Sequence, residues 1–164
     1  LLQVIAWNGP VYFRLSRAEV PVVFGADHQP EIGKAVVVRE GGDVTIVNCG
    51  VLLARAMQAA EALARKGIEA RILNMHTLKP LDSDALARAA GETGALVTVE
   101  EHSVIGGLGS AVAEELAGCC PAPLERVGLQ DRFPESGPYE ELLDRVGLAA
   151  GDIVQAVEKA IRRK

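Results

Sequence analysis

Cysteine and histidine are scarce in this sequence, and so are the sites that these residues build. The 164 residues include three cysteines and three histidines, and two of the cysteines, Cys119 and Cys120, are neighbours. Cysteines so placed make a poor disulfide framework and a poor zinc site, and the histidines show no metal-ligand spacing. We therefore expect no metal site, cysteines that serve as small apolar side chains, and a reducing cytoplasm as the setting.

Long apolar runs and an excess of basic residues are missing as well. No apolar run approaches the roughly 20 residues that cross a bilayer, and no signal peptide is visible. The net charge of −5 argues against nucleic acids and anionic membranes as partners. The composition, with 49% hydrophobic residues, is ordinary for a soluble globular protein. Because the chain begins with Leu1 rather than methionine, we expect it to be a processed product or a part of something longer.

Strand-like and helix-like segments alternate along most of the chain. The first two strands are joined through Gly41–Gly42–Asp43, which favours an antiparallel hairpin. Helix-like segments separate the later strands, which implies crossovers and a parallel sheet. The sequence therefore predicts an α/β fold with helices on both faces of a five-stranded mixed, mostly parallel sheet that has one antiparallel edge strand. The expected strands lie at 35–39, 44–47, 70–74, 96–99 and 124–127, and the expected helices at about 52–64, 84–90, 110–117 and, in two pieces, 138–164.

The beginning of the chain stands apart from this pattern. Residues 11–15 alternate like a strand but have no obvious place in the sheet, and the polar segment that follows them at 25–34 is typical of an interdomain linker. We therefore take residues 1–24 as the tail of a preceding domain, 25–35 as the linker and 36–164 as the main domain.

Ser16 and Arg17 follow the strand expected at 11–15, at the end where ligands are usually bound. An arginine there can form a bidentate pair with a phosphate, which lysine does less specifically. Spacing alone does not separate this role from that of a solvated arginine at a strand end.

The block at 96–116, LVTVEEHSVIGGLGSAVAEEL, joins a buried strand to a helix through a glycine-rich turn. A glycine loop in this position can cradle a phosphate. The loop at 106–109 lacks the third glycine of the dinucleotide fingerprint, and no acidic residue follows where ribose binding would need one. A close approach of the helix to neighbouring backbone is the favoured interpretation, with Ser110 as the N-cap.

Glu100, Glu101 and His102 follow the strand of this block and are candidates for chemistry. Adjacent strand residues point to opposite faces, so the two glutamates do not readily share a proton. We expect one to face a domain or subunit interface and the other to cap or pair locally. His102 and His76 are more readily structural or interface residues than bases, because nothing nearby supplies a nucleophile. Residues 100–102 are therefore interface candidates, and we expect no catalytic residue in this chain.

Six segments form one further pattern: GPVYFRLSR at 9–17, VTIVNCGVLLARAMQAAEAL at 44–63, NMHTLKPLD at 74–82, VTVEEHSVIGGLGSAVAEEL at 97–116, GLQDRFPESG at 128–137 and ELLDRVGL at 141–148. In their order and spacing they resemble the C-terminal portion of transketolase, particularly of the form that is split into two subunits. The resemblance implies the fold of the transketolase C-terminal domain, three layers α/β/α around the mixed sheet. It also implies that residues 1–24 end a pyrimidine-binding domain.

The resemblance implies an activity in which this chain is one part. Transketolases, known from the pentose phosphate pathway, move a two-carbon ketol unit between sugar phosphates, and thiamine diphosphate held through Mg²⁺ stabilises the carbanion. The family's metal motif is not found here, and its cofactor-activating glutamate should lie upstream of Leu1. We therefore expect this chain alone to bind neither cofactor nor metal, and to be inactive without the N-terminal transketolase portion.

The same resemblance implies roles for single residues. Arg17 corresponds to the arginine that grips the substrate phosphate, with Ser16 beside it. The main domain is expected to supply assembly contacts, including those of a homodimer. Ala149 stands where relatives often place a Thr N-cap, so the last helix is expected to begin later, at Gly151–Asp152.

Three alternatives stay open. Deoxyxylulose-phosphate synthase shares the block at 97–116, and the β subunit of 2-oxo-acid dehydrogenase complexes has a related C-terminal domain. The combination of EEH, IGGLGSAV and DRFPESG favours transketolase over both. The third alternative is a non-catalytic interaction module, against which the unplaced strand at 11–15 argues.

Overall fold

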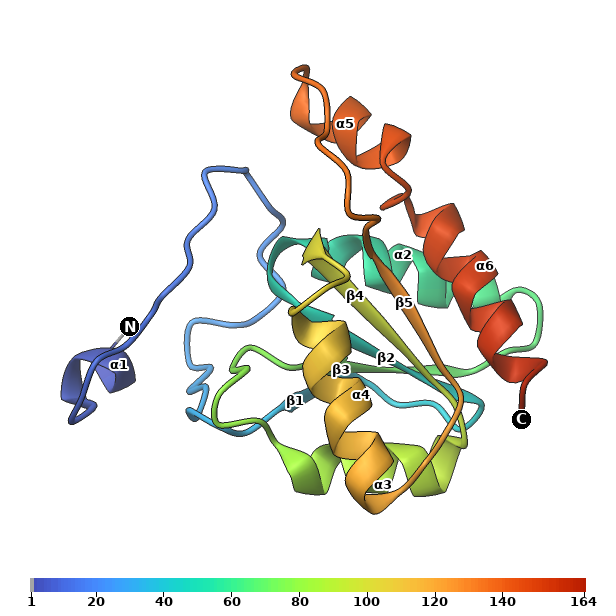
Figure 1. The fold of residues 1–164 in the computed structure, drawn as a ribbon, viewed down its shortest axis with the longest axis horizontal. Helices are drawn as coiled ribbons and strands as arrows, with labels where there is room; N and C mark the ends of the chain where they lie inside the picture. Colours follow the sequence, from blue (N-terminus) through green and yellow to red (C-terminus); the bar gives the residue numbers. More distant parts are fainter. Residues whose placement is uncertain (1) are drawn as a thin grey trace.

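A computed structural model describes residues 2–164 and contains one five-stranded sheet with helices on both faces (Figure 1). In space the strands follow the order β1-β3-β2-β4-β5. The pairs β2–β3, β2–β4 and β4–β5 are parallel, whereas the edge strand β1 is antiparallel to β3. The strands are β1 (Val36–Arg39), β2 (Val44–Cys49), β3 (Ala70–Asn74), β4 (Leu96–Ser103) and β5 (Leu124–Leu129). The predicted fold class is confirmed.

Two hydrophobic cores lie on the two faces of the sheet. On one face, Val44 and Ile46 of β2 pack in a cluster with residues of α2 and α6. On the other, Val47 packs in a cluster with residues of α3 and α4, as the alternation of side chains along a strand requires. The helices are α1 (Leu2–Ala6), the 3₁₀ helix η1 (Gly50–Leu52), α2 (Leu53–Ala64), α3 (Ser83–Thr93), α4 (Leu108–Cys119), α5 (Tyr139–Arg145) and α6 (Ala150–Ile161). Among residues 2–164, no helix is long and apolar enough to cross a membrane.

The predicted hairpin between β1 and β2 is wrong. β1 pairs with β3, which lies between β1 and β2 in the sheet. The link through Gly41 passes over the start of β3, where the amide of Asp43 donates to the carbonyl oxygen of Glu69 at 3.0 Å. A Cβ atom on Gly41 would lie 2.4 Å from the backbone of Ala70. The glycine is therefore needed for a close crossing rather than for a tight turn.

Several element ends also differ from the predictions. α3 continues past Gly91 and ends at Thr93, where its C-cap Gly94, with φ +68°, has the left-handed conformation that stops the helix. β4 does not end at Val99 but continues to Ser103. α4 begins at Leu108, before Ser110, so Ser110 is not its N-cap.

The strand predicted at 11–15 does not form among the described residues. These residues are extended and exposed, and none of the five strands pairs with them. A strand is defined by hydrogen bonds to a neighbouring strand, so an alternating sequence without such a neighbour remains an extended segment. Figure 1 shows this part of the chain running outside the sheet, with α1 well apart from it. The division at residues 24 and 35 stays a prediction.

Cys119 and Cys120 also differ from the sequence-based prediction. The structure pairs their sulfur atoms in a disulfide between adjacent residues at the end of α4, whereas we expected unpaired thiols. Cys120 follows the last residue of α4 with a non-helical backbone, φ −156° and ψ 74°, so its side chain departs from helical spacing and lies beside that of Cys119.

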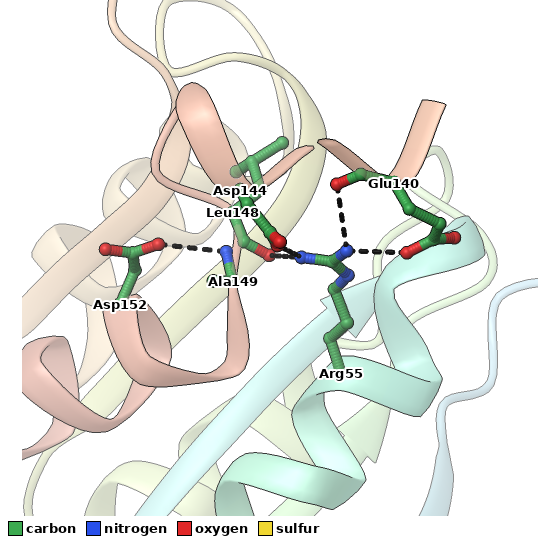
Figure 2. Close-up of polar contacts among 6 residues, drawn as sticks. All are labelled: Arg55, Glu140, Asp144, Leu148, Ala149 and Asp152. Atoms are coloured by element: carbon green, nitrogen blue, oxygen red, sulfur yellow. Dashed lines mark hydrogen bonds and ion pairs between the residues drawn. The ribbon is translucent and has the colours of Figure 1, made fainter. Parts of the chain in front are cut away.

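α5 and the start of α6 are fastened to α2 by one arginine (Figure 2). Its guanidinium donates to the carboxylates of Glu140 and Asp144, both at 2.6 Å, and to the carbonyl oxygen of Leu148 at 3.2 Å. This arginine is Arg55 of α2, and its side chain is only 13% exposed. These contacts hold α5 and the residue two before α6 beside α2, whereas α6 packs on the sheet through its buried apolar residues.

The predicted later start of α6 is wrong. The helix begins at Ala150, and the carboxylate of Asp152 accepts a hydrogen bond from the backbone amide of Ala149 at 2.9 Å (Figure 2). This is the half of a capping box that does not depend on the N-cap side chain. Ala149 has the extended conformation of an N-cap, with φ −70° and ψ 158°, but no oxygen to offer the first turn.

Replacing Ala149 by serine should therefore stabilise the protein. The new hydroxyl can accept a bond from a first-turn amide, and we expect the free energy of unfolding to rise by about 1 kcal/mol. Denaturant unfolding of Ala149→Ser and of Ala150→Ser, where the hydroxyl lies one residue too late to cap, measures the effect. Equal stabilities of the two variants would contradict it.

Candidate functional site

The carboxyl ends of β2 and β4 lie side by side, and the chain leaves them toward opposite faces of the sheet. β2 leads into α2 on one face, and β4 leads into α4 on the other. In open α/β sheets such a switch point is the usual place for ligands. Cys49 of β2 pairs in register with Glu100 of β4 at this edge.

A bulge in β4 displays the residues of the EEH triplet. Val99 pairs with Val127 and Ser103 with Leu129, so the three residues 100–102 stand opposite the single residue Gly128 of β5. A Cβ atom on Gly128 would lie 2.9 Å from the carbonyl oxygen of His102. Bulges re-aim side chains and are frequent next to active sites. Because of this bulge, the neighbouring side chains of Glu100 and Glu101 can point to different sides of the sheet.

Glu100 points inward and binds the start of α4. Its side chain is 2% exposed, and its two carboxylate oxygens accept the amides of Leu108 at 2.6 Å and Gly109 at 2.8 Å. The positive end of the helix dipole favours a negative charge at this place. Of the two glutamates, Glu100 is therefore the one that caps locally.

The glycine loop is shaped for this contact. A Cβ atom on Gly107 would lie 2.1 Å from an oxygen of Glu100, and one on Gly109 would lie 2.7 Å from the side chain of Arg126. The loop amides that could cradle a phosphate are already bound to a buried carboxylate. The loop therefore does not fit a diphosphate cofactor. The groups close to Gly107 and Gly109 are side chains, not the neighbouring backbone that we expected.

A metal fits the described residues no better. Within 2–164, the structure contains no group of three or more histidine, cysteine, aspartate and glutamate side chains that could hold a metal ion. We therefore derive no step through thiamine diphosphate or Mg²⁺ from the residues of this chain.

Glu101 points outward and contacts the N-terminal segment. A guanidinium nitrogen of Arg14 donates to the carbonyl oxygen of Glu101 at 2.9 Å, and another lies 3.9 Å from its carboxylate. The phenol of Tyr139 lies near the same carboxylate. Burial, followed by the charge of Glu101, raises the pKa of Tyr139 to about 12. Tyr139 is therefore neutral at physiological pH.

The other titratable groups of this edge show no catalytic arrangement. His102 is exposed, and its Nδ1 atom lies 2.9 Å from the carbonyl oxygen of Ser103. Burial, followed by the charge of His28, lowers the pKa of His76. Burial, followed by the charge of Glu100, raises the pKa of the Cys49 thiol and disfavours a nucleophilic thiolate. The interface roles of Glu101 and His102 stay predictions, as does that of Glu100.

The two predicted phosphate-binding residues lie in the extended N-terminal segment. Arg17 is exposed, and among residues 2–164 no carboxylate forms an ion pair with it. The hydroxyl of Ser16 accepts the amide of Ala18 at 3.0 Å. The structure thus leaves the Arg17 guanidinium available to an anion without placing one there.

Sequence reasoning missed Arg14 and Tyr139 as members of this edge. Arg14 occurs in an alternating strand-like segment, and Tyr139 in an apolar helical stripe. Their partner Glu101 is 87 residues from Arg14 in the sequence, so no local spacing could have found the contact.

Comparisons with known proteins agree with this architecture. A family model described as "Transketolase, C-terminal domain" matches residues 33–153. The chain is 49% identical over 162 residues to the 6-deoxy-6-sulfo-D-fructose transketolase subunit SqwH of Clostridium sp. (strain MSTE9) and 36% identical over 169 residues to 1-deoxy-D-xylulose-5-phosphate synthase 1 of Geobacter sulfurreducens. A solved structure described as "Split gene transketolase, inactive beta4 tetramer" superposes with a TM-score of 0.96 at 50% identity.

These matches cover nearly all of this chain but only part of each relative. They include 99% of the chain and 50% of SqwH, and 100% of the chain and 26% of the synthase. The match to the solved structure covers 99% of this chain and 54% of the other. The chain thus spans about half the length of the split subunits that it matches.

Replacing Gly107 by alanine should displace the cap of α4. Gly107 has a negative φ of −99°, so an alanine is strained by its contact with Glu100 and not by its backbone. Losing a charge-assisted hydrogen bond should lower the free energy of unfolding by about 2 kcal/mol. Gly118 lies in the same helix with nothing within 4 Å of an added Cβ, so Gly118→Ala should be neutral or stabilising. Denaturant unfolding compares them, and equal effects would contradict the role of Gly107.

Proposed function

The chain belongs to the transketolase family, of which it contains the C-terminal domain, and we propose that it is the C-terminal part of a thiamine-diphosphate-dependent transketolase divided into two subunits. The observation that carries this proposal is the match of nearly the whole chain to a split-gene transketolase, at a TM-score of 0.96 and 50% identity. The similarity to SqwH, itself called a transketolase subunit, supports the same division.

The proposed reaction is the transfer of a two-carbon ketol unit from a ketose phosphate to an aldose phosphate. In the complete enzyme, residues outside this chain would hold thiamine diphosphate through Mg²⁺, and the cofactor would act as the electron sink that stabilises a carbanion. The contribution of this chain is to bind the far end of the substrate and to hold the subunits together.

Arg17 is the proposed contact for the terminal phosphate of the sugar, with Ser16 beside it. A guanidinium presents two parallel N–H donors that match two phosphate oxygens. Arg17 is exposed and has no carboxylate partner within residues 2–164, so its charge is not already compensated. The substrate's phosphate would thus be bound away from the reacting carbonyl, where it orients the sugar.

The proposed partners are an N-terminal transketolase subunit and a second copy of the enzyme. The similar solved structure is described as a β4 tetramer that is inactive. By analogy, this chain without the other subunit would associate with its own kind and would not catalyse the transfer. Glu101 and His102, at the carboxyl edge of the sheet, are the proposed interface residues.

A second candidate substrate carries a sulfonate in place of the phosphate. The relative that shares 49% of its residues with this chain is named for 6-deoxy-6-sulfo-D-fructose. A guanidinium binds either anion through the same paired donors. The synthase of Geobacter sulfurreducens marks a further alternative reaction, although its identity to this chain is lower, at 36%.

Replacing Arg17 by alanine in the complete enzyme should raise KM for fructose 6-phosphate by about two orders of magnitude, since a lost charged contact of about 2–3 kcal/mol corresponds to that factor. The affinity for thiamine diphosphate should stay unchanged. Steady-state kinetics measure KM, with Arg88→Ala in α3 as the matched surface control. An unchanged KM would show that Arg17 is not the contact.

The same assay separates the two anions. Transfer from fructose 6-phosphate and from 6-deoxy-6-sulfofructose is compared through kcat/KM. A higher kcat/KM for 6-deoxy-6-sulfofructose would show that the substrate is the sulfonate and not the phosphate. Transfer from neither sugar would contradict the proposed transketolase activity.

A further inference from the structure

We propose that Arg14 is a positioning residue for substrate binding, because it fixes the segment that carries Ser16 and Arg17 to the C-terminal domain through Glu101. This inference rests on the proposed role of Arg17 and adds a residue to it. It assigns to Glu101, chiefly to its main-chain carbonyl oxygen, a role in holding the N-terminal segment that contains Ser16 and Arg17.

The contact of Arg14 is singular within the described chain. Between residues 2–24 and 36–164, it provides both the one side-chain hydrogen bond and the one ion pair that the structure contains. The hydrogen bond joins a guanidinium nitrogen to the carbonyl oxygen of Glu101 at 2.9 Å, whereas the carboxylate is 3.9 Å away. The main-chain carbonyl is therefore the stronger anchor, and the carboxylate adds charge.

The carbonyl of Glu101 is available because of the sheet's irregular edge. On one side, β2 ends at Cys49, which pairs with Glu100, so no β2 residue lies opposite Glu101. On the other side, the bulge opposite Gly128 interrupts the ladder to β5. A backbone carbonyl left out of a ladder needs another donor, and the Arg14 guanidinium supplies it.

The start of α5 lies beside Glu101 but forms no hydrogen bond to it, since the Tyr139 hydroxyl has no hydrogen-bond partner among the described residues. Tyr139, the first residue of α5, lies near the Glu101 carboxylate. Arg55 of α2 binds the next residue, Glu140, through both its carboxylate and its carbonyl oxygen (Figure 2). Glu101 is therefore placed between a fixed helix and Arg14.

Anchoring Arg14 restricts where Arg17 can reach. Three residues of extended chain span at most about 10 Å, and Arg17 has no ion-pair partner of its own within 2–164. Val23 and Phe24 pack against the core, so loss of the anchor would free the residues before them to sample more positions, and substrate binding would carry the cost of ordering those residues. We therefore expect loss of Arg14 to weaken binding of the terminal phosphate and to leave kcat nearly unchanged.

The experiment compares variants of the complete two-subunit enzyme on two donors, fructose 6-phosphate and the unphosphorylated ketose erythrulose. Arg14→Gln should raise KM for fructose 6-phosphate about tenfold, with kcat within about threefold and KM for erythrulose unchanged. Arg14→Lys, which keeps a donor for the carbonyl, should show a smaller rise. Glu101→Gln, which keeps the carbonyl itself, should change KM by about twofold. Arg88→Gln is the surface control.

A double variant separates positioning from direct contact. If Arg14 acts through Arg17, adding Arg14→Gln to Arg17→Ala should leave KM for fructose 6-phosphate as it is in Arg17→Ala alone. Multiplied effects, an equal rise in KM for both donors, or an unchanged KM in Arg14→Gln would overturn the positioning role while leaving Arg17 in place. An unchanged KM in Arg17→Ala would overturn both the phosphate contact and the positioning role.

Discussion

The bond between the buried carboxylate of Glu100 and the first amides of α4 determines how the carboxyl edge of this sheet is built. A charge that is 2% exposed is tolerated because two amides and the positive end of a helix compensate it. Gly107 leaves the room that the carboxylate occupies. The bulge opposite Gly128 allows the residue after Glu100 to face outward. Glu100 and the glycine loop, whose residue types could be taken for a catalytic site, thus form a helix cap.

In the proposed enzyme, the residues that stabilise this domain differ from the residue that contacts the substrate. The family signature at 97–116 stabilises the domain, whereas the proposed anion contact, Arg17, lies in the extended segment at the start of the chain. Glu101 connects the two parts through Arg14. On the far side, Arg55 keeps α5 and Tyr139 beside the same glutamate. A domain without a proposed catalytic residue can thereby affect how tightly the substrate is held.

The sequence correctly predicted features that depend only on residues close to one another in the chain. β3 was expected at 70–74 and is found there, because it is a short, mostly apolar and buried segment between a glycine turn and a polar loop. Gly67, with φ +77°, has the left-handed conformation that favours glycine after a helix, here after α2. The pairing partner of β1 was predicted wrongly, because two glycines fit both a tight turn and a crossing over β3, and only the sheet order distinguishes them.

The site was harder to predict because its contacts are distant in sequence. The cap of α4 comes from Glu100, eight residues before the amide that it binds, and takes the place expected for Ser110. The partner of Arg14 lies 87 residues away. The alternation at 11–15 predicted a strand that needs a neighbouring strand, and none of those described supplies it. The resemblance to transketolase, in contrast, was confirmed, because it rests on many segments in a fixed order.

The central claim is that the glutamate before the glycine loop is a helix cap and takes no part in the chemistry. The most direct measurement is the melting temperature and kcat of the complete enzyme carrying Glu100→Gln, assayed below its melting transition. An amide nitrogen facing a helix amide loses a charged hydrogen bond, so the account predicts a destabilisation of about 2 kcal/mol with kcat changed by less than about twofold. A kcat lowered by orders of magnitude at an unchanged melting temperature would contradict it.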